Sequence, residues 1–191
     1  FSFHDSADQL EGILDFTDWD FVQLQLNYLD WESPTIQSRA CYEVAVRHGK
    51  PVIVMEPVKG GSLAKLPPEA EALLREMHPD WSPADWAVRF AQSLPGVEVV
   101  LSGMNSLQQM EDNLREVEPL TAEELALLEK VDVKGISHIT GGGFYENIPR
   151  SIPNGLCAKI DKSAVKVLPI FDMIAKWGNI PERDMFNTYN M

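Results

Sequence analysis

The sequence predicts an α/β fold in which parallel strands alternate with helices. Four short apolar or strand-like stretches occur within the first 101 residues, and each precedes residues whose apolar side chains have helical spacing. Two of these stretches are nearly continuous apolar runs, which are typical of parallel strands covered on both faces. Because strands that alternate with helices are joined by right-handed crossovers, the four units predict half of a barrel or a small open sheet.

The first two strand–helix units are predicted before residue 50. Residues 1–4 have the pattern of the end of a strand, and a capping box at residues 6–9 predicts the start of the first helix. Residues 21–26 are the second predicted strand. The helix after it, residues 33–49, begins at a Ser-Pro pair and stops at a glycine, which suits its two ends.

The third and fourth predicted strands are the apolar runs at residues 51–55 and 97–101. Two helices are predicted between them and two more after them, from apolar spacing, a first-turn proline and a capping box that begins at Thr121. These four predicted helices are residues 67–77, 82–94, 106–117 and 121–131.

The composition changes after residue 131, so we predict strand–helix units at residues 1–131 and a loop-rich, partly helical extension at residues 132–191. The extension begins rich in Gly, Ser and Pro. Three glycines at residues 141–143 would cost too much backbone entropy inside a helix, and we interpret them as a flexible linker. Residues 164–177 predict one further helix, which Pro169 would break or kink.

The composition also excludes several classes of partner. A net charge of −13 would repel phosphate backbones and anionic lipid, so neither nucleic acid nor a membrane is an expected partner. No apolar run approaches the roughly 20 residues that a membrane-spanning helix needs. The two cysteines, Cys41 and Cys157, suit neither a disulfide framework nor a paired zinc site, which favours a cytoplasmic location.

Polar side chains follow each predicted strand, at the end of a parallel sheet where ligands bind. They lie within residues 2–5, 25–28, 55–61 and 102–106. Neutral amides and hydroxyls orient a planar carboxamide, while glycine-rich turns and helix N-termini offer backbone N–H groups to phosphate. The combination predicts a nucleotide-binding site.

The motifs at these four places resemble strands five to eight of the aldo-keto reductases, in that family's order. They are Phe1-Ser2-Phe3-His4-Asp5, Gln25-Leu26-Asn27-Tyr28, Val52-Ile53-Val54-Met55-Glu56-Pro57, and Ser102-Gly103-Met104 followed by Glu111-Asp112-Asn113-Leu114. The resemblance covers residues 1–131 and implies half of a (β/α)8 TIM barrel. It is strongest to a bacterial subgroup that often ends in a ferredoxin-like cysteine cluster, and residues 180–182 and 186–190 resemble the segment after that cluster.

The resemblance implies an NAD(P)H-dependent oxidoreductase that reduces a small carbonyl substrate to an alcohol by hydride transfer. The family's catalytic Tyr, Lys, Asp and His come from earlier strands, and His4 does not match that His. We therefore expect no catalytic residue in this chain, which would supply the cofactor-binding half and be inactive alone. The alternative is a non-catalytic nucleotide-binding or regulatory half-barrel. Open sheet edges predict pairing with a missing half-barrel or a homodimer partner.

Eleven positions match the family's contacts to the cofactor. Ser2 and Gln25 match residues that hydrogen-bond the nicotinamide carboxamide, and Met55 stands where many members place an aromatic ring against the nicotinamide. The other eight follow the last two strands: Glu56, Pro57, Gly60, Ser102, Gly103, Asn105, Gln109 and Asn113. Lys59 or Ser62 is a further candidate for a phosphate contact.

Two other implications concern the choice of cofactor. Asn105 stands where NADP-preferring members often have Arg, whose fork of donors binds phosphate in a way that an amide cannot replace. The cofactor is therefore predicted to be NAD or NADP. An iron–sulfur cluster is not expected, because Cys157 is the single cysteine in the matching region and such clusters need about four.

Several other residues have a structural and a functional interpretation. Trp31 follows the second strand on the face where substrates bind, so it either lines a substrate pocket or packs in the core, as aromatic side chains usually do. His48, His78 and His138 have no partner at ligand spacing, and no metal site is predicted.

Overall fold

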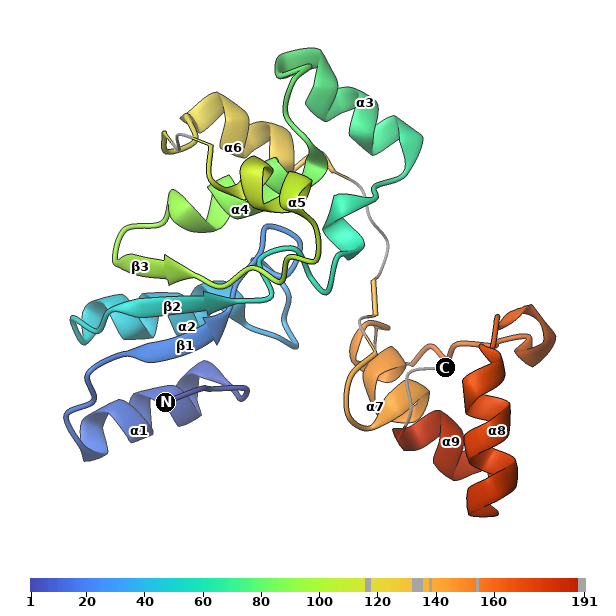
Figure 1. Cartoon of the computed structure of the whole chain (residues 1–191). Helices are drawn as coiled ribbons and strands as arrows, with labels where there is room; N and C mark the ends of the chain where they lie inside the picture. The colour runs from blue at the N-terminus through green and yellow to red at the C-terminus, as the bar shows by residue number, and fades with distance from the viewer. Residues whose placement is uncertain (116–117, 132–135, 138, 154, 189–191) are drawn as a thin grey trace. The chain divides into compact units, whose positions relative to one another are not determined.

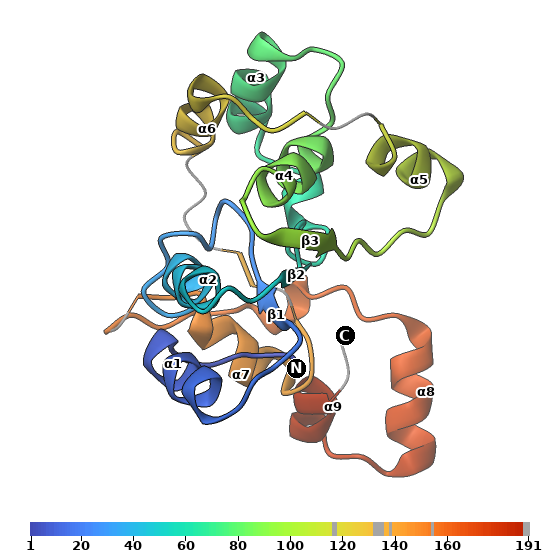
Figure 2. The same ribbon diagram turned by 90° about the vertical axis from the view of Figure 1, so that its left-hand side faces the viewer.

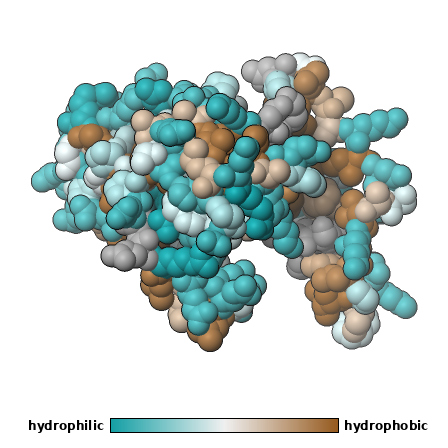
Figure 3. Space-filling model, turned by 90° about the horizontal axis from the view of Figure 1, so that it is seen from above, coloured by the Kyte–Doolittle hydropathy of each residue, from teal (hydrophilic) through white to brown (hydrophobic). Residues whose placement is uncertain are grey.

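The computed structural model describes residues 1–115, 118–131, 136–137, 139–153 and 155–188 (Figure 1). The chain divides into two compact units, Phe1–Val133 and Lys134–Met191, and each is described by itself. No helix among the described residues combines the length and the apolar character that spanning a membrane requires. Hydrophilic side chains dominate the face of the molecule in Figure 3, as expected for a chain with this net charge.

The described part of the first unit is built on a parallel sheet of three strands. They are β1 (Val22–Gln25), β2 (Val52–Met55) and β3 (Val97–Val100), in the order β1-β2-β3. The register pairs Val22 with Val52, and Val52 with Val97. The sheet is parallel because the chain returns through a helix between successive strands, which confirms the predicted α/β class.

The predicted first strand is present only as a single parallel bridge between Ser2 and Gln23. Phe3 N donates to the Gln23 carbonyl at 3.0 Å, and Gln23 N donates to the Phe1 carbonyl at 2.8 Å. Four parallel stretches therefore lie side by side, in agreement with half of a barrel, although the first is too short to count as a strand.

Seven helical segments occur among the described residues of this unit. They are α1 (Ala7–Phe16), α2 (Ser38–Arg47), the 3₁₀ turn η1 (Ser62–Ala64), α3 (Pro68–Met77), α4 (Pro83–Gln92), α5 (Leu107–Asn113) and α6 (Ala122–Leu128). The predicted capping box of α6 is confirmed, because Thr121 and Glu124 bond reciprocally. Pro83 lies in the first turn of α4, also as predicted, with Ser82 as its cap.

The first helix begins where it was predicted, but its capping box is not formed, and one other predicted helix start is wrong. Ser6 precedes α1 but its side chain caps nothing; the Ala7 amide donates instead to Gln37 Oε1 at 3.0 Å. The helix predicted from residue 33 begins at Ser38, because residues before it form turns and Gln37 adopts a left-handed conformation with a φ of 55°.

Alternate residues of β1 and β2 give the sheet two different faces. Val22, Leu24, Val52 and Val54 are buried against side chains of α1, α2 and α4, whereas the residues between them are only partly buried. Figure 2 shows these three helices on one side of the strands. The core thus lies between sheet and helices, and the other face presents Gln25 and Met55.

The second unit contains α7 (Gly143–Arg150), the 3₁₀ turn η2 (Lys162–Ala164), α8 (Pro169–Gly178) and α9 (Glu182–Thr188). Helices α7 and α9 pack together, with the rings of Phe144 and Phe186 5.5 Å apart. Asn147 is buried and donates to the Gly143 carbonyl at 2.8 Å.

Two predictions for the extension are wrong. The glycines at residues 141–143 are not a linker: Gly142 caps α7 with a φ of 92°, and Gly143 begins the helix. Glycine supplies the left-handed conformation that this helix start requires. Pro169 does not break a helix, because it is the first residue of α8, where its missing N–H costs nothing.

Candidate cofactor site

The predicted cofactor residues gather at the carboxyl ends of the strands. Gln25 ends β1 and Met55 ends β2, and the two residues are paired in the register of the sheet. Ser2 Oγ lies 3.7 Å from Met55 Sδ, so the nearby bridge adds Ser2 to the same place. These three side chains project from the sheet face that the helices leave uncovered.

A cavity of about 630 Å³ lies between the segment that follows β2 and the segment that runs from β3 into α5. It brings together the eight predicted residues of the last two strands: Glu56, Pro57, Gly60, Ser102, Gly103, Asn105, Gln109 and Asn113. Ser2, Gln25, Met55 and Trp31 are not part of its wall. Ala84 is a wall residue that the sequence did not indicate, because it comes from α4, outside the motifs. Asp112 is also on the wall; it belongs to the last motif but was not among the predicted cofactor contacts.

The segment after β2 is a tight turn held by left-handed residues. Glu56 and Lys59 have φ values of 53° and 47°, and Gly60 and Gly61 follow with positive φ. Lys59 N donates to the Glu56 carbonyl at 3.0 Å, and Gly61 N donates to the Val58 carbonyl at 3.0 Å. A left-handed conformation is unfavourable for residues other than glycine, so this turn is held by its surroundings.

The segment after β3 is held by amide side chains. Asn113 Nδ2 donates to Ser102 Oγ at 2.9 Å, and Gln109 Oε1 accepts from Asn105 N at 2.8 Å. Ser106 caps α5 by accepting from Gln109 N. These contacts within the segment fix the amide side chains along the cavity wall.

The charges on the cavity wall are acidic. Glu56 and Asp112 are both wall residues, and the described wall contains no Lys or Arg. Asp112 accepts from Ser82 Oγ at 2.6 Å and pairs with Arg115 at 3.1 Å. A phosphate group in this cavity would therefore depend on backbone N–H groups and not on cations of its wall.

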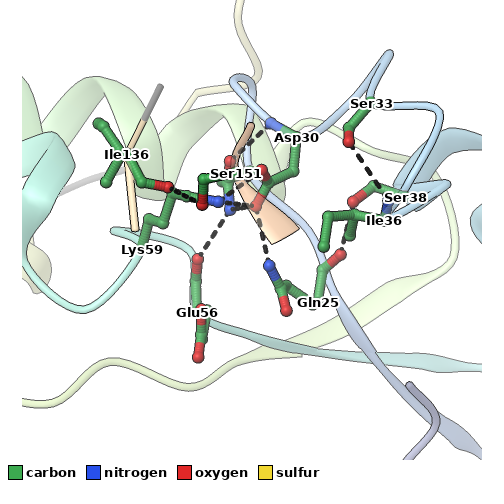
Figure 4. Close-up of polar contacts among 10 residues, drawn as sticks. Gln25, Asp30, Ser33, Ile36, Ser38, Glu56, Lys59, Ile136 and Ser151 are labelled. Atoms are coloured by element: carbon green, nitrogen blue, oxygen red, sulfur yellow. Dashed lines mark hydrogen bonds and ion pairs between the residues drawn. The ribbon is translucent and has the colours of Figure 1, made fainter. Parts of the chain in front are cut away.

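Lys59 is directed away from the cavity into a buried ion pair with Asp30. Lys59 Nζ lies 2.5 and 2.7 Å from the two carboxylate oxygens of Asp30, and both side chains are less than a tenth exposed. The prediction that Lys59 contacts phosphate therefore does not fit this geometry. Figure 4 shows Lys59 and Gln25 both directed at Asp30.

Two amides complete the surroundings of Asp30. Gln25 Nε2 and Asn27 Nδ2 each donate to Asp30 Oδ2 at 2.8 Å, and Asp30 N donates to Asn27 Oδ1 at 2.9 Å. Asn27 Nδ2 also lies 3.2 Å from the Glu56 carbonyl. This cluster, which we call the Asp30 cluster (Gln25, Asn27, Asp30, Lys59), joins the end of β1 to the turn after β2. Sequence reasoning missed Asp30, since no motif links it to Lys59.

Trp31 is partly buried and packs against the core of the unit. Its ring lies 5.4 Å from the ring of Tyr42 and 5.4 Å from that of Phe90, and it contacts the main hydrophobic core. These contacts agree with the second of the two interpretations of Trp31, a residue that packs in the core and does not line a substrate pocket.

The histidines differ from expectation, because two of them have acidic partners. His48 Nε2 lies 2.8 Å from Glu11 and 3.9 Å from Asp15, and these three residues are close enough to share an ion. Hydrogen bonds from His48 and then from Arg47 hold the pKa of Glu11 below its usual value. His78 pairs with Glu124, and His138 lies outside the described residues.

The second unit has a cavity of its own, of about 570 Å³. Side chains of α7, α9 and the segment between α7 and η2 form it, and most of them are apolar. Cys157 and the Lys162–Glu182 ion pair also lie on its wall. Cys41 is buried in the first unit, where burial raises the pKa of its thiol to about 11.

Two family models match the chain. Residues 1–133 match the aldo/keto reductase family, and residues 91–191 match the C-terminal domain of AIR synthase related proteins. The matches overlap at residues 91–133, where the structure places β3 in the sheet of the first unit. The second match covers the extension, whereas the first ends at residue 133, so the predicted likeness of the extension to the tail of cluster-bearing reductases is not confirmed.

The chain is also similar to solved structures of aldo-keto reductases. The holo form of aldo-keto reductase AKR11C1 from Bacillus halodurans is 26% identical, with a TM-score of 0.54, and the similarity covers 69% of this chain and 49% of that one. An aldo-keto reductase from Klebsiella pneumoniae in complex with NADPH is 19% identical, with a TM-score of 0.51, over 68% of this chain and 45% of that one. The latter shows similarity of fold alone, and the chain spans about half of each.

Curated relatives resemble a shorter part of the chain. The phosphoribosylformylglycinamidine cyclo-ligase of Caldicellulosiruptor saccharolyticus is 52% identical over 67 residues, which are 35% of this chain and 20% of that protein. The cyclo-ligase of Lachnospira eligens is 61% identical over 61 residues, or 32% and 18%. The chain thus spans about one fifth of these relatives.

Proposed function

The chain belongs to the aldo/keto reductase family over residues 1–133, and we propose that this part holds the nicotinamide dinucleotide of a carbonyl reductase. The observation that carries the proposal is the cavity between the segments after β2 and β3, which gathers eight family-matched positions beside the ends of the strands. Ligands of parallel α/β proteins bind at these ends. When bound, the cofactor would supply the hydride that reduces a carbonyl to an alcohol.

The residues divide between the two ends of such a cofactor. Ser2 and Gln25 would hold the carboxamide of the nicotinamide, with Met55 as a polarisable surface beside its ring. Gly60 would meet the pyrophosphate with its backbone N–H, because Lys59 N and Gly61 N already donate within the turn. Gln109 and Asn113 would face the adenosine. Each of these residues stands at a family-matched position and lies at or beside this edge of the sheet.

We propose NAD in preference to NADP. The 2′-phosphate of NADP favours a bidentate Arg, and this chain has Asn105 at the matching position. Glu56 and Asp112 on the cavity wall would add repulsion to a further phosphate. The NADPH of the Klebsiella pneumoniae protein belongs to a relative that shares the fold, so it does not decide the cofactor of this chain.

The reduction itself requires an acid that protonates the carbonyl oxygen. The family takes it from strands that precede the four matched here, so the proposed contribution of residues 1–133 is to bind and orient the cofactor. A second candidate, a nucleotide-binding half-barrel that pairs with another chain, is favoured by one observation. Strand β3 pairs with β2 alone among the described residues, and its Val99 is 45% exposed.

The chain also belongs to the AIR synthase related family over residues 91–191. The chain spans about one fifth of the cyclo-ligases that it resembles, so we do not propose their activity for it. The proposed cofactor binding concerns the first unit. The cavity of the second unit is a separate feature, and none of the proposed cofactor residues lies on its wall.

Titration of the chain with NADH and with NADPH, followed by tryptophan fluorescence, tests the proposal. We expect saturable binding of NADH that is tighter than that of NADPH. Changing Gln25 and Asn113 together to alanine is expected to weaken NADH binding at least tenfold, since each lost hydrogen bond contributes about 1 kcal/mol. Circular dichroism checks that the variant is folded. Absence of binding of both dinucleotides would reject the proposed site.

A further inference from the structure

The Asp30 cluster fixes which way the amide of Gln25 faces. The carboxylate of Asp30 can only accept hydrogen bonds when it is ionised, and the ammonium of Lys59 lies 2.5 Å from it to balance its charge. The atom of Gln25 that lies 2.8 Å from Asp30 must therefore be the nitrogen, Nε2. Reversing the amide would place Oε1 against a buried carboxylate, which is repulsive.

The backbone at Gln25 is held as well, so the side chain has a fixed origin. Ser38, which is buried in α2, donates from Oγ to the Gln25 carbonyl at 2.8 Å. Gln25 is also the last residue of β1 and is paired with Met55 in the sheet. The amide is thus anchored at the backbone and at Nε2.

The remaining polar atom of Gln25 is Oε1, and no hydrogen bond to it occurs among the described residues. Figure 4 shows it on the side of the amide away from Asp30. An amide oxygen accepts hydrogen bonds and cannot donate them. Gln25 therefore presents an acceptor at the end of β1, next to the sheet face that carries Met55.

We propose that Asp30 is a positioning residue that makes Gln25 an acceptor and thereby selects a ligand with an amide N–H at this point. Resting on the proposed function, that ligand group is the carboxamide of a nicotinamide, whose NH₂ would donate to Gln25 Oε1. A 3-acetylpyridine dinucleotide carries a methyl group in place of the NH₂. It leaves Oε1 without a donor, and the site discriminates against it.

The test compares the affinity of the whole chain for NADH and for reduced 3-acetylpyridine adenine dinucleotide, by calorimetry. Loss of one hydrogen bond to a desolvated acceptor predicts that the wild-type chain binds NADH about tenfold more tightly. Gln25→Leu is expected to reduce this preference to about twofold or less. The preference, rather than the affinity itself, is the readout, because a general loss of structure would weaken both ligands.

The variant that tests Asp30 must not strand the charge of Lys59 in the interior. Asp30→Asn with Lys59→Met removes both charges, and the Asn side chain can then accept from or donate to Gln25. The amide of Gln25 becomes free to turn, and the preference for NADH is expected to fall from about tenfold towards twofold or less. Asp20→Asn, which changes an exposed carboxylate before β1, is the matched control and should retain the wild-type preference.

The outcomes separate this inference from the proposed function. If the chain binds neither dinucleotide, the proposed function is rejected and the inference with it. If NADH binds but the acetylpyridine analogue binds equally well, the site holds a dinucleotide and the role of Gln25 as acceptor is wrong. If the tenfold preference persists in the double variant, Asp30 does not position Gln25.

Discussion

At the scale of a single residue, two tyrosines of the first unit differ in the hydrogen bonding of their hydroxyl groups. The Tyr28 hydroxyl is buried and has no hydrogen-bond partner among the described residues, and burial raises its pKa. The Tyr42 hydroxyl donates to the Pro95 carbonyl at 2.7 Å. A buried polar group without a partner costs free energy, whereas a bonded one contributes about 1 kcal/mol.

Tyr28→Phe is therefore expected to leave the free energy of unfolding unchanged or to raise it by up to about 1 kcal/mol. The ring, which meets that of Phe90 edge to face at 6.2 Å, stays in place. Tyr42→Phe is the matched control and should lower the free energy of unfolding by about 1 kcal/mol, because it removes the hydrogen bond to the Pro95 carbonyl. Urea unfolding measures both. Equal losses in the two variants would contradict the assignment of Tyr28 as unpaired.

The place of the proposed cofactor residues at the ends of the strands could be predicted, because they follow apolar runs; their individual roles are what the family resemblance implies. Gln25 and Met55 end their strands, as their positions after the apolar runs indicated. The ion pair between Asp30 and Lys59 could not be predicted. These residues are 29 positions apart, and their contact depends on how two turns approach each other in space.

At the scale of an element, the start of α7 is restricted by its contact with α9. Gly143 has a φ of 58°, and a Cβ atom added to it would lie 1.9 Å from the Phe186 carbonyl oxygen. No heavy atom lies within 4 Å of a Cβ added to Gly141, two residues earlier, and its φ is not in the left-handed region. The pair offers a test of packing within one short glycine run.

Gly143→Ala is expected to separate α7 from α9 and to cost at least about 2 kcal/mol, through backbone strain and the clash together. Gly141→Ala is expected to change stability by less than about 0.5 kcal/mol. Hydrogen exchange of the amides of α7 and α9 measures the local free energy of opening. Similar protection in the two variants would show that the close approach of Gly143 to α9 is not needed.

The same helix shows where prediction from local sequence fails at this scale. Caps with side-chain partners, such as Thr121 with Glu124, were predicted correctly because the signal lies within four residues. The glycines at residues 141–143 have the local pattern of a linker, but a left-handed glycine cap and the contact with α9 place them at a helix start. That contact joins segments more than forty residues apart, which no local pattern indicates.

At the scale of the whole chain, the α/β class and the parallel order of the strands could be predicted from the alternation of apolar runs and helical segments. The length of the first strand could not. Residues 1–4 supply two ladder hydrogen bonds and one bridge, because the chain turns into α1 directly afterwards. The similarity of the extension to AIR synthase related proteins could not be predicted either, because the composition and spacing of its residues do not indicate it.

Strand β3 ends the sheet of the first unit among the described residues, and its exposed Val99 is accompanied by Leu101, which is 44% exposed. An open edge with apolar side chains favours pairing with another strand. We expect two copies of the chain to associate through this edge, and therefore an increase in sedimentation coefficient between about 1 and 100 µM, where weak dimers form. Because each copy carries a net charge of −13, association should strengthen as salt screens the repulsion.

Val99→Lys should abolish this association, since a charge on an edge strand opposes pairing. Val46→Lys, at a valine of α2 with 42% exposure, is the control and should associate like the wild type. A chain that stays monomeric at every concentration and salt would rule out the homodimer.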